Sequence, residues 1–83
     1  MDIHKDGFVF KKSTRKDKKY DVFKNGKKIA SFGGLGYQQY KDKIGLYTEL
    51  DHLDKNRRRL YYARHGTTAK KYSPKYFSHR YLW

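Results

Sequence analysis

The sequence predicts an α+β domain, in which a small antiparallel sheet of two or three strands packs against one main helix and a short C-terminal aromatic helix. Three observations support this prediction. An Asn-Gly pair separates two apolar segments, a long helical segment ends at a glycine, and a Ser-Pro pair opens an aromatic C-terminal segment. With 83 residues the chain fits one small basic domain, 1–83, with residues 1–6 as a flexible N-terminus.

The first strand is expected close to the N-terminus. Phe8 and Phe10 alternate within residues 7–13, and a period of two is typical of a strand. The charged stretch 14–18 follows as its loop.

The next two strands form a hairpin at Asn25-Gly26. These residues separate the apolar segments 19–23 and 28–32, and Asn-Gly favours a two-residue turn because both positions tolerate positive φ. Such a turn fixes the register and the two faces. We expect Val22 opposite Ile29 and Tyr20 opposite Ser31 on one face, with Phe23, Ala30 and Phe32 on the other.

A glycine-rich segment follows the hairpin. Gly33, Gly34 and Gly36 favour a chain reversal over a nucleotide loop, since no Gly-Lys-Ser/Thr follows them. The spacing of Tyr37, Tyr40 and Ile44 then predicts about two turns of helix, ending near Gly45.

The main helix is predicted over residues 51–65. Asp51 and Asp54 provide acidic residues at its start, Arg64 and His65 lie in its last turn, and Gly66 caps its end. The apolar stripe of this helix is narrow and consists of Leu53, Leu60 and Tyr61.

The C-terminal aromatic helix begins at Ser73-Pro74, an N-cap followed by proline in the first turn. It contains Tyr76, Phe77 and Tyr81, and the final Tyr-Leu-Trp is expected to dock into the core. Aromatic residues make up 18% of the chain, half of its hydrophobic fraction of 36%, so the core must be built largely from rings.

The charge balance indicates an anionic partner. The chain has 21 Lys and Arg against 8 Asp and Glu, a formal net charge of +13. A polyanion is the simplest partner, because each neutralised phosphate also releases condensed counterions. Nucleic acid is favoured over an anionic membrane, since no basic helix with an aliphatic face is visible.

The candidate contacts lie in two places. Lys24, Lys27 and Lys28 surround the hairpin tip and form a compact cationic finger. On the main helix Arg58, Tyr62 and His65 share one face, which suits phosphate contact and base stacking. The other arginines of the helix, Arg57, Arg59 and Arg64, complete the predicted phosphate contacts.

Enzymatic chemistry and cofactors are not expected. Without cysteine there is no thiolate metal site or cysteine nucleophile, and the four histidines lack a metal-binding spacing. A nuclease with His65 and Arg64 at its site remains a remote alternative. The N-terminus has no apolar signal region, and no apolar run is long enough to span a membrane, so neither secretion nor a membrane partner is expected.

Four segments of the chain resemble a known group of proteins. They are SFG at 31–33, YQQYKDK at 37–43, RRLYYARHG at 58–66 and YFSHRYLW at 76–83. Over residues 19–83 the chain resembles small, basic, uncharacterised proteins of large DNA viruses of algae and protists, with distant relatives in tailed phages. The resemblance implies a viral source and a virion or genome-handling role, and it supplies no catalytic residues. Residues 1–15 lie outside it.

We therefore expect sequence-tolerant nucleic-acid binding through the phosphate backbone, in viral genome handling or packaging, with DNA ahead of RNA as the partner. The alternative is a virion structural component that binds acidic capsid or internal virion proteins. Unpaired hairpin edges and surplus aromatic residues are also compatible with a homodimer. The expected location is the virion or the interior of a host cell, in cytoplasm or nucleus.

Overall fold

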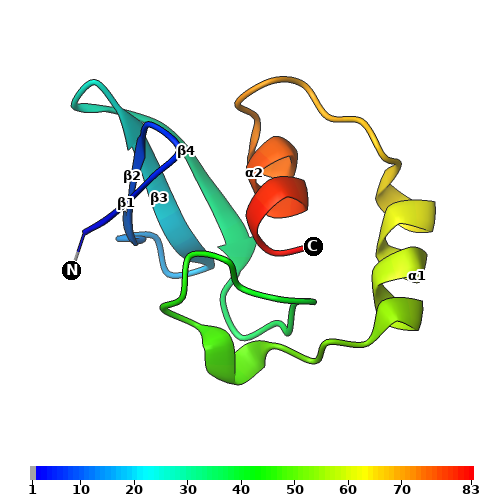
Figure 1. Cartoon of the computed structure of the whole chain (residues 1–83). Helices are drawn as coiled ribbons and strands as arrows, with labels where there is room; N and C mark the ends of the chain where they lie inside the picture. Colours follow the sequence, from blue (N-terminus) through cyan, green and yellow to red (C-terminus); the bar gives the residue numbers. More distant parts are fainter. Residues whose placement is uncertain (1) are drawn as a thin grey trace.

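The computed structural model describes residues 2–83 and shows an α+β fold (Figure 1). Its four-stranded antiparallel sheet has the order β1-β2-β3-β4. The strands are β1 (Ile3–Lys5), β2 (Phe8–Lys12), β3 (Lys18–Lys24) and β4 (Lys27–Gly34). The 3₁₀ helix η1 (Thr48–Leu50) and the helices α1 (Lys55–His65) and α2 (Pro74–Tyr81) follow. The predicted fold class is confirmed, and β1 adds an edge strand that the sequence pattern does not predict.

The hairpin turn at Asn25-Gly26 is confirmed, and the pairs next to the turn have the expected register. The predicted register is wrong farther from the turn, from Val22 back to the start of β3. Both turn residues have positive φ, 53° and 76°. The ladder then shifts by one residue between Val22 and Phe23, as at a β-bulge, which places Val22 opposite Ala30 and Tyr20 opposite Phe32. An unshifted ladder would turn Phe32 away from Tyr20, so the shift is what brings Phe32 into the core.

The core lies between the sheet and α2, which covers one face of it (Figure 1). Ring contacts dominate: Phe10 and Tyr81 have centroids 4.8 Å apart, and Phe32 and Phe77 5.5 Å apart. The predicted start of this helix is confirmed, because Ser73 Oγ accepts the Tyr76 N–H and Pro74 occupies the first turn. The C-terminal residues dock as expected, with Tyr81 and Leu82 fully buried.

The helix predicted from Tyr37 to Ile44 is wrong, and this segment is an irregular loop. The buried carboxylate of Asp42 organises it by accepting the N–H groups of Ile44 and Tyr47, at 2.9 and 2.8 Å, and the hydroxyl of Tyr20. The N–H groups of Lys41 and Lys43 donate to the carbonyls of Leu82 and Tyr81. A helix would draw these N–H groups into its own ladder, so tertiary hydrogen bonds outweigh the helical spacing.

The main helix begins at Lys55 instead of Asp51. Asp54 is its N-cap and accepts the N–H groups of Asn56 and Arg57, while Leu53 has a φ of 56° that no helix can contain. Its predicted apolar stripe is wrong except for Tyr61, since Leu53 and Leu60 are 59% and 50% exposed. Its predicted end is confirmed, because Gly66 is the C-cap.

Candidate nucleic-acid interface

A groove of about 630 Å³ lies between α1, α2 and the open end of the hairpin, where β3 begins and β4 ends. Five of its lining residues are Lys or Arg, which we call the groove cations: Lys18, Lys19, Arg57, Arg64 and Lys75. Aromatic and imidazole rings line it as well, from Tyr37, Tyr61, His65 and Trp83. Proteins that bind nucleic acid commonly combine such residues: basic side chains contact the phosphates, and aromatic rings stack on exposed bases.

None of the eight acidic residues of the chain lines this groove. The ion pairs among residues 2–83 all lie elsewhere and join Lys11 to Asp2, Arg15 to Asp17, Lys28 to Asp21 and Arg80 to Asp6. The groove cations therefore have no neutralising carboxylate at contact distance within the described chain, and their fields add in a concave space.

One face of α1 forms a wall of the groove. Arg57, Tyr61, Arg64 and His65 follow the spacing i, i+4, i+7 and i+8, which places them on a single helix face. Arg57 Nη1 donates to Gln38 Oε1 at 2.8 Å, which holds its guanidinium beside the loop that follows β4. Only one of the five guanidinium N–H groups is needed for that bond, so Arg57 keeps donors for a phosphate.

Lys19 lies at the floor of the groove and is 1% exposed. Its ammonium donates to the carbonyl of Tyr37. Burial lowers the pKa of Lys19, and the negative charges of Asp42, Asp51 and Glu49 partly oppose that shift. Lys19 thus fixes the loop that carries Tyr37.

The rings of the groove differ in how they are held. Tyr37 is 76% exposed, yet its ring packs on Gly34, where a Cβ would lie 2.6 Å from its Cδ2. Trp83 stacks parallel on Tyr61, with centroids 4.2 Å apart and an interplanar angle of 6°. Burial raises the pKa of Tyr61 to about 12, so its phenol stays protonated at neutral pH. Tyr37 therefore presents a largely free ring, while Trp83 shares its stacked face with Tyr61.

The predicted contacts on α1 separate into two groups. Arg57, Arg64 and His65 line the groove. Arg58 is used inside the protein: its Nε donates to the Trp83 carbonyl at 2.6 Å, and its guanidinium lies 5.1 Å from the Tyr40 ring.

The other two predicted contacts of α1 also bond within the protein. The Tyr62 hydroxyl donates to the His79 carbonyl. Arg59 is exposed outside the groove and donates to Asn56. The face formed by Arg58, Tyr62 and His65 is therefore committed mainly to the contact between α1 and the C-terminal residues.

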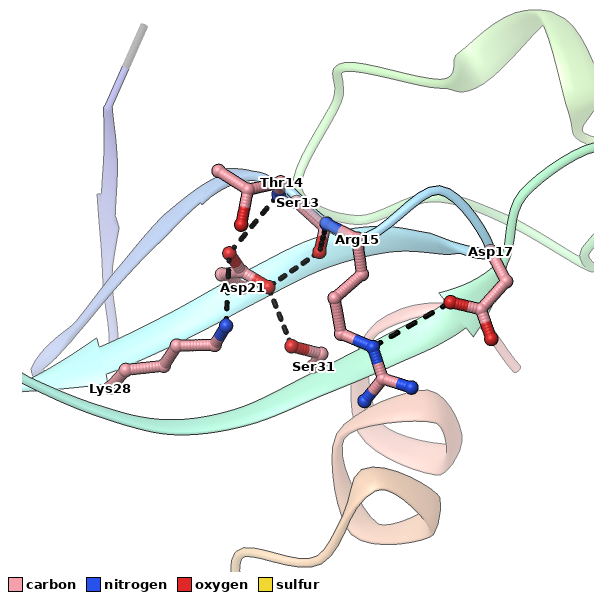
Figure 2. Close-up of polar contacts among 7 residues, drawn as sticks. All are labelled: Ser13, Thr14, Arg15, Asp17, Asp21, Lys28 and Ser31. Carbon is pink, nitrogen blue, oxygen red and sulfur yellow. Dashed lines mark hydrogen bonds and ion pairs between the residues drawn. The ribbon is translucent and has the colours of Figure 1, made fainter.

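The hairpin tip does not join the groove, and Figure 1 shows it on the opposite side of α2 from α1. Lys28 lies 3.5 Å from the carboxylate of Asp21, which also accepts the hydroxyls of Ser13 and Ser31, both at 2.6 Å (Figure 2). Lys24 is 3.1 Å from the Tyr72 hydroxyl and lies over two aromatic rings. Of the three tip lysines, Lys27 alone is exposed without such a contact among the described residues.

Sequence reasoning missed Lys18, Lys19, Lys75, Tyr37 and Trp83 as members of one site. The signal for the α1 wall was present, because Arg57 lies four residues before Tyr61. The rest depends on the loop after β4 and the start of α2 meeting in space, which spacing along the chain does not show.

Residues 2–83 contain neither a cluster of metal ligands nor a membrane-spanning helix. No group of three or more His, Cys, Asp or Glu side chains there is placed to hold a metal ion. Neither α1 nor α2 has the length and apolar character needed to cross a membrane.

A family of unknown function, DUF5754, matches residues 8–65, from β2 to the end of α1. No curated protein and no solved structure matches the chain. The family region contains the hairpin and α1 walls of the groove, and α2 lies beyond it.

Proposed function

We propose that this chain, which belongs to the DUF5754 family of unknown function, binds nucleic acid through the phosphate backbone at the groove between the hairpin, α1 and α2, with little sequence preference. The supporting observation is that five Lys and Arg residues line one concave surface, whose lining includes no Asp or Glu. Together with the resemblance to proteins of large DNA viruses, this supports a role in genome handling or packaging.

The chemistry of the groove suits the phosphate groups of a nucleic-acid backbone. Arg57 and Arg64 offer planar forks that donate two parallel N–H bonds to one phosphate, and the lysines add point charges around them. No array of base-reading amides accompanies these cations, since Gln38 is the only Asn or Gln that lines the groove and it already accepts from Arg57. Backbone contact without base readout gives affinity without sequence specificity.

The test is a salt series with a double variant in the groove. Arg57→Ala with Arg64→Ala removes two groove cations, and we expect it to weaken binding of a labelled oligonucleotide at least about tenfold. The plot of log affinity against log salt should become shallower by about 1.5, since each lost phosphate contact removes about 0.7 to 0.9 from the slope.

The matched control is Lys27→Ala with Arg59→Ala, which removes the same charge from exposed positions outside the groove. We expect a change of about threefold or less, because only screened long-range attraction is lost. Equal effects of the two double variants would contradict the groove as the site. Absence of binding at about 50 mM salt would overturn the proposed function and indicate an acidic protein partner in the virion instead.

A further inference from the structure

We infer that the groove accepts a single strand of nucleic acid, with one unpaired base stacked on the exposed ring of Tyr37. This inference rests on the proposed function and adds to it the form of nucleic acid that the site selects. Three features of the structure support it.

The first feature is that the Tyr37 ring is exposed but held in place. Its 76% exposure exceeds that of every other large hydrophobic side chain described, the next being Leu53 at 59%. Three contacts fix its position: its N–H donates to the Gly34 carbonyl at 3.2 Å, its carbonyl accepts from Lys19, and its ring packs on Gly34. A ring that is fixed on one side and open on the other can stack on a base. Because the ring is already ordered in the free protein, binding loses little further side-chain entropy there.

The second feature is the use of a buried lysine to hold that ring. Burying the Lys19 ammonium costs free energy, and its one hydrogen bond among the described residues is to the Tyr37 carbonyl. The arrangement keeps the loop fixed where the groove cations surround it.

The third feature is the size and charge of the groove. At about 630 Å³ it has the volume of a small-molecule site, which accommodates a nucleotide unit. Its cations lie on both walls, with Lys18 at the hairpin end and Arg64 on α1, so they can follow one backbone passing between them. In a duplex the faces of interior bases are covered by their neighbours, and Tyr37 could not reach them without unstacking the helix.

Arg57 links the Tyr37 ring to the phosphates. Its guanidinium donates to Gln38, the residue after Tyr37, and so lies beside the same stretch of the groove. A base stacked on Tyr37 would place its own phosphate group within the reach of Arg57, a combination that single-strand binding proteins use without sequence readout.

The experiment compares strand forms on the whole chain. Binding of single-stranded DNA, single-stranded RNA and a duplex of equal length is measured by fluorescence anisotropy for the native protein, Tyr37→Ala and Tyr37→Phe. We expect the single strands to bind at least about tenfold more tightly than the duplex. Tyr37→Ala should weaken single-strand binding about 5- to 100-fold, the range for loss of one stacked base, while Tyr37→Phe retains it.

An internal reporter is present in the groove. Trp83 is the only tryptophan of the chain and lines the groove, so single strands should change its emission at the same concentrations at which anisotropy rises. The DNA and RNA arms show which sugar the site prefers, and tight binding of either single strand supports the inference. Circular dichroism verifies that Tyr37→Ala is folded, as expected for an exposed side chain.

The failure of this inference differs from failure of the proposed function. Equal affinity for duplex and single strands, or an equal effect of Tyr37→Ala on both, would overturn the single-strand inference and leave phosphate binding intact. Loss of binding to all three nucleic acids in the native protein would overturn the proposed function itself.

Discussion

Two regions of this protein are rich in basic residues, and they treat their charge in opposite ways. On the hairpin, Lys28 is balanced by Asp21, whose carboxylate also accepts three hydrogen bonds (Figure 2). In the groove five Lys and Arg residues line one concave space, and no Asp or Glu lies in the lining. The net charge of +13 therefore does not distinguish the two regions, whereas the placement of the eight acidic residues does.

The largest expected effect comes from removing the negative charge of Asp21, which faces Lys28 on the hairpin. Asp21→Asn leaves the shape of the site but removes the negative charge that Ser13, Ser31 and Lys28 face, and it replaces Oδ2, which accepts the Thr14 N–H, with an amide that cannot accept. We expect the free energy of unfolding to fall by about 2 kcal/mol, because buried hydrogen bonds to a charged group are lost.

Urea unfolding measures this effect, and Lys28→Ala serves as the milder comparison because its side chain is 42% exposed. Nucleic-acid affinity of a folded Asp21→Asn sample should stay within about threefold of the native value, since Asp21 does not line the groove and its charge acts only through screened attraction. A loss comparable to that of the groove variants would mean that the two regions are not independent.

The second largest effect is expected from placing a carboxylate in the groove, where no Asp or Glu lies. Gln38→Glu is close to isosteric and places a carboxylate on Arg57, which already contacts the Gln38 side chain. We expect nucleic-acid affinity to fall about tenfold, because the new carboxylate competes with phosphate for the guanidinium. Stability should change by less than about 1 kcal/mol.

Asn25→Asp is the matched control for Gln38→Glu. It makes the same change in net charge at the hairpin tip, where Asn25 has a φ of 53° that aspartate also tolerates. Anisotropy titrations of both variants at one salt concentration separate local competition from overall charge. Equal weakening by the two would point to diffuse attraction over the whole surface.

The smallest effect is a difference in how the two regions respond to acid. Burial opposes ionisation of Asp21, but hydrogen bonds from Ser13, Ser31 and Thr14 and the charge of Lys28 outweigh it, so its pKa lies below the ordinary 3.8. The stabilisation that Asp21 provides is complete above pH 3.8 and is lost as the pH falls through its folded pKa.

The histidines beside the contact between α1 and the C-terminal residues also lose stability on acidification, but in a higher pH range than Asp21. Burial, aided by nearby cations, lowers the pKa of His52 and of His79 below 6.5, so the folded state favours their neutral forms. Acidification below pH 6.5 then lowers stability, because the unfolded chain takes up protons more readily. Thermal unfolding between pH 7.5 and 5.5 measures this, and His79→Gln should flatten the profile. A native profile already flat over that interval would contradict the assignment.

Local signals in the sequence were sufficient for the parts of the fold that local chemistry determines. Asn25-Gly26 dictates its turn, and Ser73-Pro74 and Gly66 dictate their helix ends, because each acts through its own backbone or a neighbour within one helical turn. The register shift after Phe23 could not be predicted, since it depends on whether burying Phe32 outweighs a regular ladder.

The groove could be predicted only in part for a related reason. Arg57, Arg64 and His65 were identified from their helix, but their partners come from segments that meet only after folding. The burial of Lys19 is the clearest example. A lysine beside apolar residues in a strand ordinarily points to solvent, and here the loop around Tyr37 closes over it.

The way α1 is attached predicts that this helix opens more readily than the sheet. This helix meets the rest of the molecule through side chains, chiefly the Tyr61–Trp83 stack and the bonds of Tyr61 and Tyr62 to His79, while β3 and β4 share a continuous backbone ladder. In terms of native-state hydrogen exchange, the amides of α1 belong to a unit that opens at lower cost than the sheet. A ligand that bridges both walls would raise that opening cost, so occupancy of the groove would be recorded as slower exchange along α1.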